Sequence, residues 1–294
     1  MTYTTLRAGL SYGILALGSW GLLPLFWRHL TGVPSAEIIA HRVIWSFTFL
    51  CVIVWRTGKR SELLSACRSP KILSLLALSG TLIATNWLVY VWGVHHGHLS
   101  DASLGYFVSP LLTIALGAVV LKEPLSKRQK VAVAVAAFGV LFKAVSEGIF
   151  PWVGISLAFS ISLYSFIRKQ LGISSLAGLT VETALLTPVA LGYTALLTIQ
   201  GNSQMTTMGY STALLLVATG IVTSLPLLWF VKASQLLPLS ILGIIQYLSP
   251  TLQLLLAIYC FKEPTTSTSL GAFCIIWSAI ALYLSDGFKT SKSV

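Results

Sequence analysis

Three ionisable residues, Glu37, His41 and Arg42, stand at the start of one strongly apolar stretch of the chain. Glu37 and His41 are four residues apart, so on a helix they share one face, with Trp45 one turn further along. Charge among apolar side chains is destabilising unless it has a partner or a function. Because a guanidinium binds a carboxylate or phosphate through two parallel hydrogen bonds, Arg42 is a candidate anion clamp. We predict substrate contacts for Arg42 and His41, and a coupling or gating role for Glu37.

Arg42 has an alternative role as one half of a structural ion pair. Comparison of the chain with itself at an offset of 140 residues places Glu182 at the position equivalent to Arg42. Equivalent positions of an inverted repeat can face each other, so Glu182 is the predicted partner, and the pair would act as a gate that opens when substrate competes for Arg42. Glu37, His41 and Glu182 are also titratable groups in apolar surroundings, which favours proton coupling, whereas a simple facilitator needs none of them.

A second group of candidate substrate contacts consists of aromatic and amide side chains within apolar stretches: Asn86, Trp87, Tyr90, Tyr106, Tyr164 and Gln246. Tyr106 and Gln246 stand one helical turn before Pro110 and Pro250. Proline removes a backbone donor and bends a helix, which frees carbonyl groups that can serve a cavity. Together with Arg42 and an acid, these groups would suit a zwitterionic or anionic metabolite with a planar portion.

The histidines His95, His96 and His98 are close enough together to suggest a metal cluster. Asp101 is the only other ligand type nearby, so we expect a solvated loop there, with no metal site and no cofactor. The formal net charge of +11 does not indicate nucleic-acid binding, because the basic residues are spread between apolar runs and do not gather on one face. The absence of a G-x-x-x-x-G-K-[ST] motif disfavours ATP-driven transport.

The elements that must position these residues are apolar helices. The 294 residues are 55% hydrophobic and only 9% charged, too little charge for the surface of a water-soluble domain of this length. A bilayer core of about 30 Å requires about 20 apolar residues per helix. The sequence therefore predicts an all-α integral membrane protein with ten transmembrane helices: 7–27, 36–55, 72–93, 100–121, 129–146, 150–167, 176–199, 211–231, 238–260 and 267–285.

Lysine and arginine are distributed unequally between the connections of these helices. If the N-terminus is cytoplasmic, 15 of the 19 fall on the cytoplasmic side and 3 on the other, with Arg42 inside a span. Cytoplasmic connections of membrane proteins carry an excess of these residues. We therefore predict that both termini are cytoplasmic and that the lipid bilayer surrounds the chain.

The offset of 140 residues relates several motifs at once. Ser109-Pro110 recurs as Ser249-Pro250, and Lys122-Glu123-Pro124 recurs as Lys262-Glu263-Pro264. The predicted repeats are residues 7–146 and 150–285. Each contains five helices, an odd number, so the second copy must cross the membrane in the opposite orientation. Inverted repeats are typical of secondary transporters, in which a pseudo-symmetric scaffold opens to either side of a midplane cavity.

Four groups of residues carry a resemblance to a known family: Glu37 to Ser46 (EIIAHRVIWS), Asn86-Trp87, Ala102 to Phe107 (ASLGYF) with Ser109-Pro110, and Gln246-Tyr247 with Ser249-Pro250. Nearly the whole chain resembles the RarD subfamily of the EamA-type permeases, in the drug/metabolite transporter superfamily. The resemblance implies a bacterial-type inner (plasma) membrane location and permease activity on small metabolites or drug-like solutes. It also implies that the fifth and tenth helices buttress the bundle or form a homodimer contact.

Two other classes of function compete with a secondary permease. A membrane-embedded enzyme usually carries paired carboxylates or a His/Asp metal set in one leaflet, whereas the ionisable groups here are few and divided between the halves. A receptor or assembly subunit would bind a ligand without flux. The internal repeat favours a permease that works by alternating access, so we predict no enzymatic activity.

Overall fold

The computed structural model describes residues 3–95, 99–147, 152–262 and 267–290. Within these ranges the chain is helical and contains no β-strand. Its first half contains α1 (Tyr3–Trp27), η1 (Arg28–Leu30), α2 (Ser35–Thr57), α3 (Arg60–Arg68), α4 (Pro70–His95), α5 (Leu99–Ala115), the π-helical η2 (Leu116–Val120) and α6 (Lys127–Glu147). Its second half contains α7 (Trp152–Gln170), α8 (Ser175–Ile199), α9 (Gln204–Thr207), α10 (Tyr210–Leu236), α11 (Leu239–Gln246), α12 (Leu248–Tyr259) and α13 (Ser267–Thr290).

Most of the long helices are apolar enough to cross a lipid bilayer. Among the described residues, seven helices have the length and hydropathy of a span, and two shorter apolar helices, Gly105–Val120 and Leu270–Ser285, accompany them. A helix overlaps each of the ten predicted ranges. Large apolar side chains also cover the outside of the bundle; Val145 and Val189, for example, are 79% and 76% exposed. Lipid as the solvent explains this exposure, so the chain is a multi-pass membrane protein. Of the predicted histidine loop, His96 and His98 lie outside the described residues.

The sixth predicted range is more polar because α7 lies inside the bundle, where it packs against α4, α5 and α10. Its serines Ser160, Ser162 and Ser165 are buried. The hydroxyl of Ser162 donates to the carbonyl of Ser109 and contacts the hydroxyl of Thr113, both at 3.1 Å. Hydroxyl groups that are satisfied by a neighbouring helix make a polar helix compatible with apolar surroundings.

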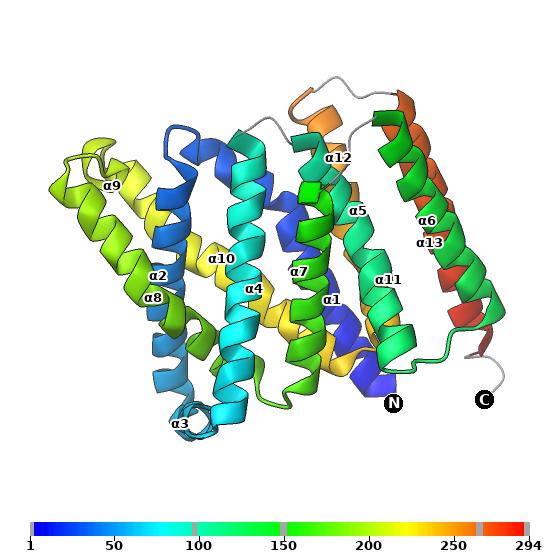
Figure 1. Cartoon of the computed structure of the whole chain (residues 1–294), viewed down its shortest axis with the longest axis horizontal. Helices are drawn as coiled ribbons and strands as arrows, with labels where there is room; N and C mark the ends of the chain where they lie inside the picture. Colours follow the sequence, from blue (N-terminus) through cyan, green and yellow to red (C-terminus); the bar gives the residue numbers. More distant parts are fainter. Residues whose placement is uncertain (1–2, 96–98, 148–151, 263–266, 291–294) are drawn as a thin grey trace.

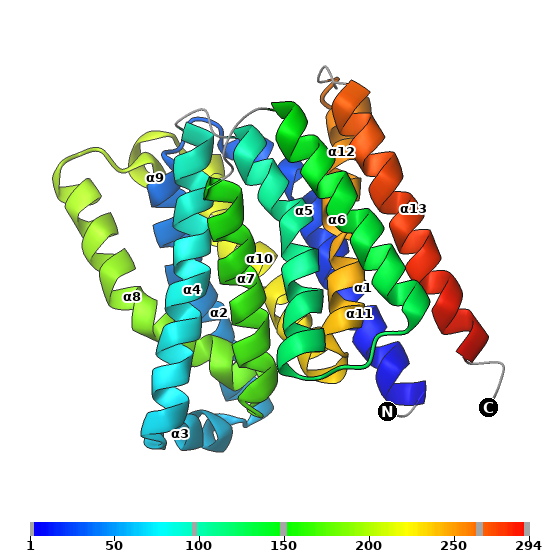
Figure 2. The same cartoon turned by 45° about the vertical axis from the view of Figure 1, so that its right-hand side comes forward.

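The start of α1 and the end of α13 lie at the same end of the bundle, together with α3 and the connection between η2 and α6 (Figure 1). We call this the terminal end. The opposite, distal end carries α9 and the connection between α1 and α2. The main helix pairs are α1–α10, α1–α12, α2–α8, α2–α10, α4–α7, α4–α8, α5–α7, α5–α11 and α6–α13. The last pair, α6–α13, forms one side of the bundle (Figure 2).

This set of pairs is unchanged when the helices of the two halves are exchanged. If α1, α2, α4, α5 and α6 correspond to α7, α8, α10, α11–α12 and α13, then α1–α10 becomes α4–α7 and α5–α7 becomes α1–α12. The pairs α2–α8 and α6–α13 become themselves. Lys122 and Lys262, which are 140 residues apart, have φ angles of 54° and 53°, and among the described non-glycine residues they alone have positive φ. Corresponding helices run in opposite directions, since α1 runs toward the distal end and α7 away from it (Figure 1).

An apolar core fills the terminal half of the bundle. Leu17 of α1, Tyr164 of α7 and Phe230 of α10 belong to one buried cluster. The close approach of α2 to α10 depends on Gly220, because a Cβ atom there would overlap the backbone of Trp45. Burial of large aromatic side chains between closely packed helices stabilises this half of the bundle and leaves little room for water.

Candidate functional site

A cavity of about 440 Å³ lies among α1, α2, α4, α5, α7, α11 and α12. Its lining includes Trp27 and Ser35, next to the α1–α2 connection at the distal end. It extends inward to Leu17 and Ile83, near the middle of α1 and of α4. The apolar cluster of α7 and α10 occupies the bundle beyond this limit. The cavity therefore reaches one end of the bundle and is closed toward the other.

Six of the eight residues predicted to contact substrate line this cavity: Arg42, Asn86, Trp87, Tyr90, Tyr106 and Gln246. They come from α2, α4, α5 and α11, so the fold brings together segments that are far apart in the sequence. The other two, His41 and Tyr164, are absent from the lining. A concave, mainly apolar space with a few convergent polar groups is the usual form of a small-molecule site.

Arg42 stacks on an aromatic ring of the cavity wall, with its Cζ atom 3.3 Å from the ring centroid of Trp87. The rings of Tyr90 and Tyr106 meet edge to face nearby on α4 and α5, with centroids 5.8 Å apart. The Nε atom of Arg42 is buried without a hydrogen-bond partner, and no described carboxylate lies within ion-pair distance of the guanidinium. A guanidinium stacked on a ring keeps the N–H groups in its own plane free. Arg42 is therefore an unpaired cation at the cavity.

Two amide side chains of the cavity lining differ in whether they are free to bind a ligand. Asn86 donates from Nδ2 to the carbonyl of Leu157 and to the hydroxyl of Ser160, both at 2.9 Å, which joins α4 to α7. The Oε1 atom of Gln246, in contrast, is buried without a partner. Asn86 is thus largely engaged in holding two helices together, whereas the amide of Gln246 is free to bind a ligand.

The two prolines predicted to bend helices both line the cavity. The helix α5 continues through Pro110, whereas the chain changes from α11 to α12 at Tyr247, three residues before Pro250. Proline offers no N–H to the carbonyl four residues earlier. The carbonyls of Tyr106 and Gln246 therefore lack a helical donor beside the cavity.

Glu37 is fully buried and holds the connection between α8 and α10. Its Oε1 atom accepts hydrogen bonds from the hydroxyl of Ser203 at 2.9 Å and from the N–H of Met205 at 3.2 Å. Nε2 of His41 lies 3.8 Å from the same oxygen. The predicted shared face of Glu37 and His41 is real, but it faces α9. His41 is therefore outside the cavity lining, and its predicted contact with substrate stays a prediction.

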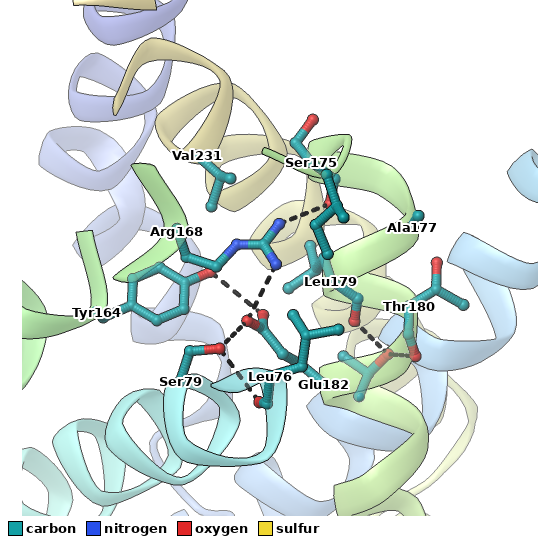
Figure 3. Close-up of polar contacts among 12 residues, drawn as sticks. Leu76, Ser79, Tyr164, Arg168, Ser175, Ala177, Leu179, Thr180, Glu182 and Val231 are labelled. Carbon is teal, nitrogen blue, oxygen red and sulfur yellow. Dashed lines mark hydrogen bonds and ion pairs between the residues drawn. The ribbon is translucent and has the colours of Figure 1, made fainter. Parts of the chain in front are cut away.

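Glu182 lies in a closed network between α4, α7 and α8 (Figure 3). Its Oε1 atom is 3.4 Å from Nη1 of Arg168 and accepts a hydrogen bond from Ser79, while Oε2 accepts one from the hydroxyl of Tyr164 at 3.3 Å. The side chains of Arg168 and Glu182 are 0% and 1% exposed. The predicted ion pair between Arg42 and Glu182 is therefore wrong, because Arg168 is the partner of Glu182.

Depth along the helices explains this correction. Arg42 and Glu182 each follow the first residue of their helix by seven positions, but α2 starts at the distal end and α8 at the terminal end (Figure 1). At a rise of about 1.5 Å per residue, they lie roughly 10 Å from opposite ends of the bundle. Arg42 therefore meets the cavity, and Glu182 meets the closed half. Arg168, counted above among the cytoplasmic connections, is inside that half as well.

Two further charged residues hold the turn between α10 and α11 at the terminal end. Glu123 accepts hydrogen bonds from the N–H of Leu239 at 2.8 Å and from the N–H and hydroxyl of Ser240 at 2.9 and 2.8 Å. Lys169 donates to carbonyls at the C-terminus of α10, including that of Ser234 at 3.2 Å. A carboxylate at a helix start and an ammonium at a helix end complement the helix dipoles. The sequence indicated neither role.

The cavity residues that were not predicted include Trp20, Trp27 and Gln253. On sequence alone the two tryptophans fit a membrane-interface belt equally well. Trp27 follows Trp20 by seven residues, and Gln253 follows Gln246 by seven. Two helical turns return to the same face of α1, so this spacing is the signal that would have placed Trp20 and Trp27 together. The two glutamines lie on separate helices, α11 and α12.

Known proteins align with this chain along most of its length. The EamA-like transporter family matches residues 7–144. The uncharacterized transporter YojE of Bacillus subtilis (strain 168) is 41% identical, over 100% of this chain and 99% of that protein. Protein RarD of Streptomyces exfoliatus is 40% identical, over 97% and 91%, and Protein RarD of Escherichia coli (strain K12) is 37% identical, over 97% of each. A solved crystal structure with 18% identity shares the fold, with a TM-score of 0.71 over 94% of this chain and 97% of that one.

Relatives that align from end to end include proteins named as transporters, and the multi-pass fold encloses a cavity of the size of a solute. These findings define a membrane transporter. The chain belongs to the EamA-like transporter family and, within it, to the RarD subfamily.

Proposed function

We propose that this protein is a secondary transporter that moves small metabolites or drug-like solutes by alternating access around the cavity. The observation that carries the proposal is the one-sided cavity, which reaches the distal end and stops near the middle of the bundle. Alternating access requires a state of this form, in which a midplane site is open to one side and closed to the other. Among the described lining residues there are no paired carboxylates or metal ligands of the kind that a membrane-embedded enzyme needs.

We further propose ten transmembrane helices in two inverted repeats, residues 7–146 and 150–285. The exchange symmetry of the helix pairs, the equal φ angles of Lys122 and Lys262 and the opposite directions of corresponding helices support this topology. The excess of lysine and arginine supports cytoplasmic termini in a bacterial-type inner membrane. In this topology the cavity opens to the outside, and the terminal end contains the cytoplasmic gate.

The contacts of the closed end are the natural components of that gate. Glu123 and Lys169 hold the α10–α11 turn, and the pair of Arg168 and Glu182 holds α7 against α8. In the proposed cycle, the first four spans of each repeat rock against each other, these contacts separate, and the distal end closes. The pair α6–α13 lies at the side of the bundle, where it buttresses the moving parts or forms a homodimer contact.

Proton coupling is a separate hypothesis. Glu37, His41 and Glu182, the groups that would carry the proton, are outside the cavity lining. A role for Glu182 would therefore act through the closed network and not through contact with the solute. The test is the flux of a reconstituted substrate between about pH 5.5 and 8 under an imposed proton gradient. A flat rate would contradict coupling.

Access to a cysteine in the cavity tests alternating access before the solute is known. The four native cysteines are first replaced by serine, and Ser249→Cys is then introduced in the cavity lining. A membrane-impermeant maleimide is added to one side of oriented membrane vesicles. We expect labelling from either side, because the site is exposed alternately to both. Ser126→Cys, in the connection at the terminal end, is the control and should react from the cytoplasmic side only.

A receptor or assembly subunit gives a different result in the same experiment. Labelling of Ser249→Cys from one side only, under all conditions, would refute transport by this route. A static pore would give labelling from both sides that does not change when a ligand or a gate mutation shifts the protein toward one state. Alternating access instead requires that the two rates change in opposite directions.

A further inference from the structure

Charge in the cavity is unbalanced. Among the described residues that line it, Arg42 is the one side chain that carries a full charge at neutral pH. The other polar groups, such as Asn86, Gln246 and Gln253, are neutral. Trp87 covers one face of the guanidinium, and Nε is buried without a partner. A cation in apolar surroundings is unfavourable unless a counter-charge joins it, and the described lining residues provide none for Arg42.

The two acids that the sequence placed at this site are engaged elsewhere. Glu37 accepts hydrogen bonds from Ser203 and Met205, and Glu182 pairs with Arg168 in the closed half. Neither acid is therefore available to the cationic group of a zwitterionic solute. The geometry favours the anionic alternative of the sequence-based expectation over the zwitterionic one.

We propose that the solute is an organic anion with a planar apolar portion, bound through its carboxylate or phosphate by Arg42. This substrate class rests on the transport function proposed above. The in-plane N–H groups of the guanidinium match two oxygens of such an anion. Trp20, Trp87, Tyr90 and Tyr106 supply flat apolar walls for a ring. An uncharged analogue would leave the guanidinium buried and unpaired, and for this reason it would bind more weakly.

Gln246 gives the site a second polar contact. Its Oε1 atom is buried without a partner, so it can accept a hydrogen bond from a hydroxyl or N–H group on the ring of the solute. Arg42 comes from the first half of the chain and Gln246 from the second, and both line the same cavity. A solute that binds both would connect the two halves, which is the arrangement needed if binding is to influence their relative position.

Matched acids and amides test the substrate class on the purified protein. The probes are benzoate with benzamide and indole-3-acetate with indole-3-acetamide, which differ in charge but hardly in shape. Phenyl phosphate is added to distinguish a phosphate from a carboxylate. Thermal unfolding at rising concentrations of each probe gives its dissociation constant. We expect at least one anion to bind about tenfold or more tightly than its neutral counterpart. For phenyl phosphate, benzamide is the neutral reference.

Variants on α2 assign the preference to Arg42. Arg42→Gln should abolish it, Arg42→Lys should retain part of it, and Arg56→Gln, at an exposed arginine of the same helix, should leave it unchanged. Equal affinity of acids and amides in the unmodified protein would overturn the proposal, as would a preference that survives Arg42→Gln or the absence of binding by every probe. Each of these results concerns the substrate class alone, because the cysteine-access experiment tests transport without any ligand.

Discussion

At the buried pair of Arg168 and Glu182, we expect removal of one partner to lower the free energy of unfolding more than removal of both. Glu182→Gln leaves the guanidinium of Arg168, which is 0% exposed, without a counter-charge. It also weakens the acceptor for the hydroxyl of Tyr164, which is 3.3 Å from Oε2. Breaking a buried pair in this way costs about 3–5 kcal/mol of the free energy of unfolding.

The double variant Arg168→Met with Glu182→Leu removes both charges and leaves apolar side chains of similar volume. Such replacements are often neutral or stabilising. We therefore expect the double variant to be less destabilised than Glu182→Gln alone. A double-mutant cycle compares the double variant with the single variants Arg168→Met and Glu182→Leu. The coupling energy between the two residues should reach about 2 kcal/mol. The measurement is denaturant-induced unfolding in mixed micelles.

The pair of Lys59 and Glu62, at the start of α3, is a matched control within the same chain. Its atoms are 3.8 Å apart, but its side chains are 46% and 44% exposed. An exposed pair contributes less than about 1 kcal/mol, so its double-mutant cycle should show almost no coupling. If the effects at Arg168 and Glu182 simply add, the two residues do not act as a unit. The network of Figure 3 would then have no role in closing the terminal half.

Three further substitutions test the remaining contacts. Gly178→Ala should lower the free energy of unfolding by about 1–3 kcal/mol, because a Cβ atom there would overlap the guanidinium of Arg168. In an Arg168→Met background this loss of stability should largely vanish. A loss that persists would show that overlap with Arg168 is not its cause. Glu123→Gln weakens the charged acceptor at the start of α11. Labelling of Ser249→Cys should then become faster from the cytoplasmic side and slower from the outside. Unchanged labelling rates would exclude Glu123 from the gate. Glu37→Ala leaves two buried donors unsatisfied and should destabilise the protein by about 1–3 kcal/mol without changing the relative flux of any solute, whereas lost flux in a stable protein would restore the predicted gating role.

The organisation of the long helices was accessible from the sequence because each of them is an apolar run bounded by polar or turn residues, whereas the short polar helices α3 and α9 were not predicted. The range 150–167 is more polar than the other apolar runs, and its buried serines explain why. The cavity was accessible in part. Arg42, Trp87 and Tyr106 are residues that an apolar helix does not carry without a reason, and they converge on one space.

Side-chain partners were not accessible, because equivalence within a repeat fixes a position along a helix but not its depth in the bundle. Glu182 is the counterpart of Arg42 in the sequence, yet the two lie in opposite halves. Arg168 follows an apolar run and looks like a residue of a connection, but the neighbouring helix α8 covers it completely. A one-dimensional pattern contains no information on such coverage.

The difference between these equivalent positions is what could give the transporter its cycle. An exactly symmetric pair of repeats would build the same contacts at both ends of the bundle. Here one copy places an unpaired cation, Arg42, at the open cavity, and the other places an acid, Glu182, in a charge pair with Arg168 within the closed half. An anion that neutralises Arg42 would remove the unpaired charge of the cavity in the proposed outward-facing state. Binding could then supply the free energy with which the contacts of Glu182 and Glu123 at the other end are separated.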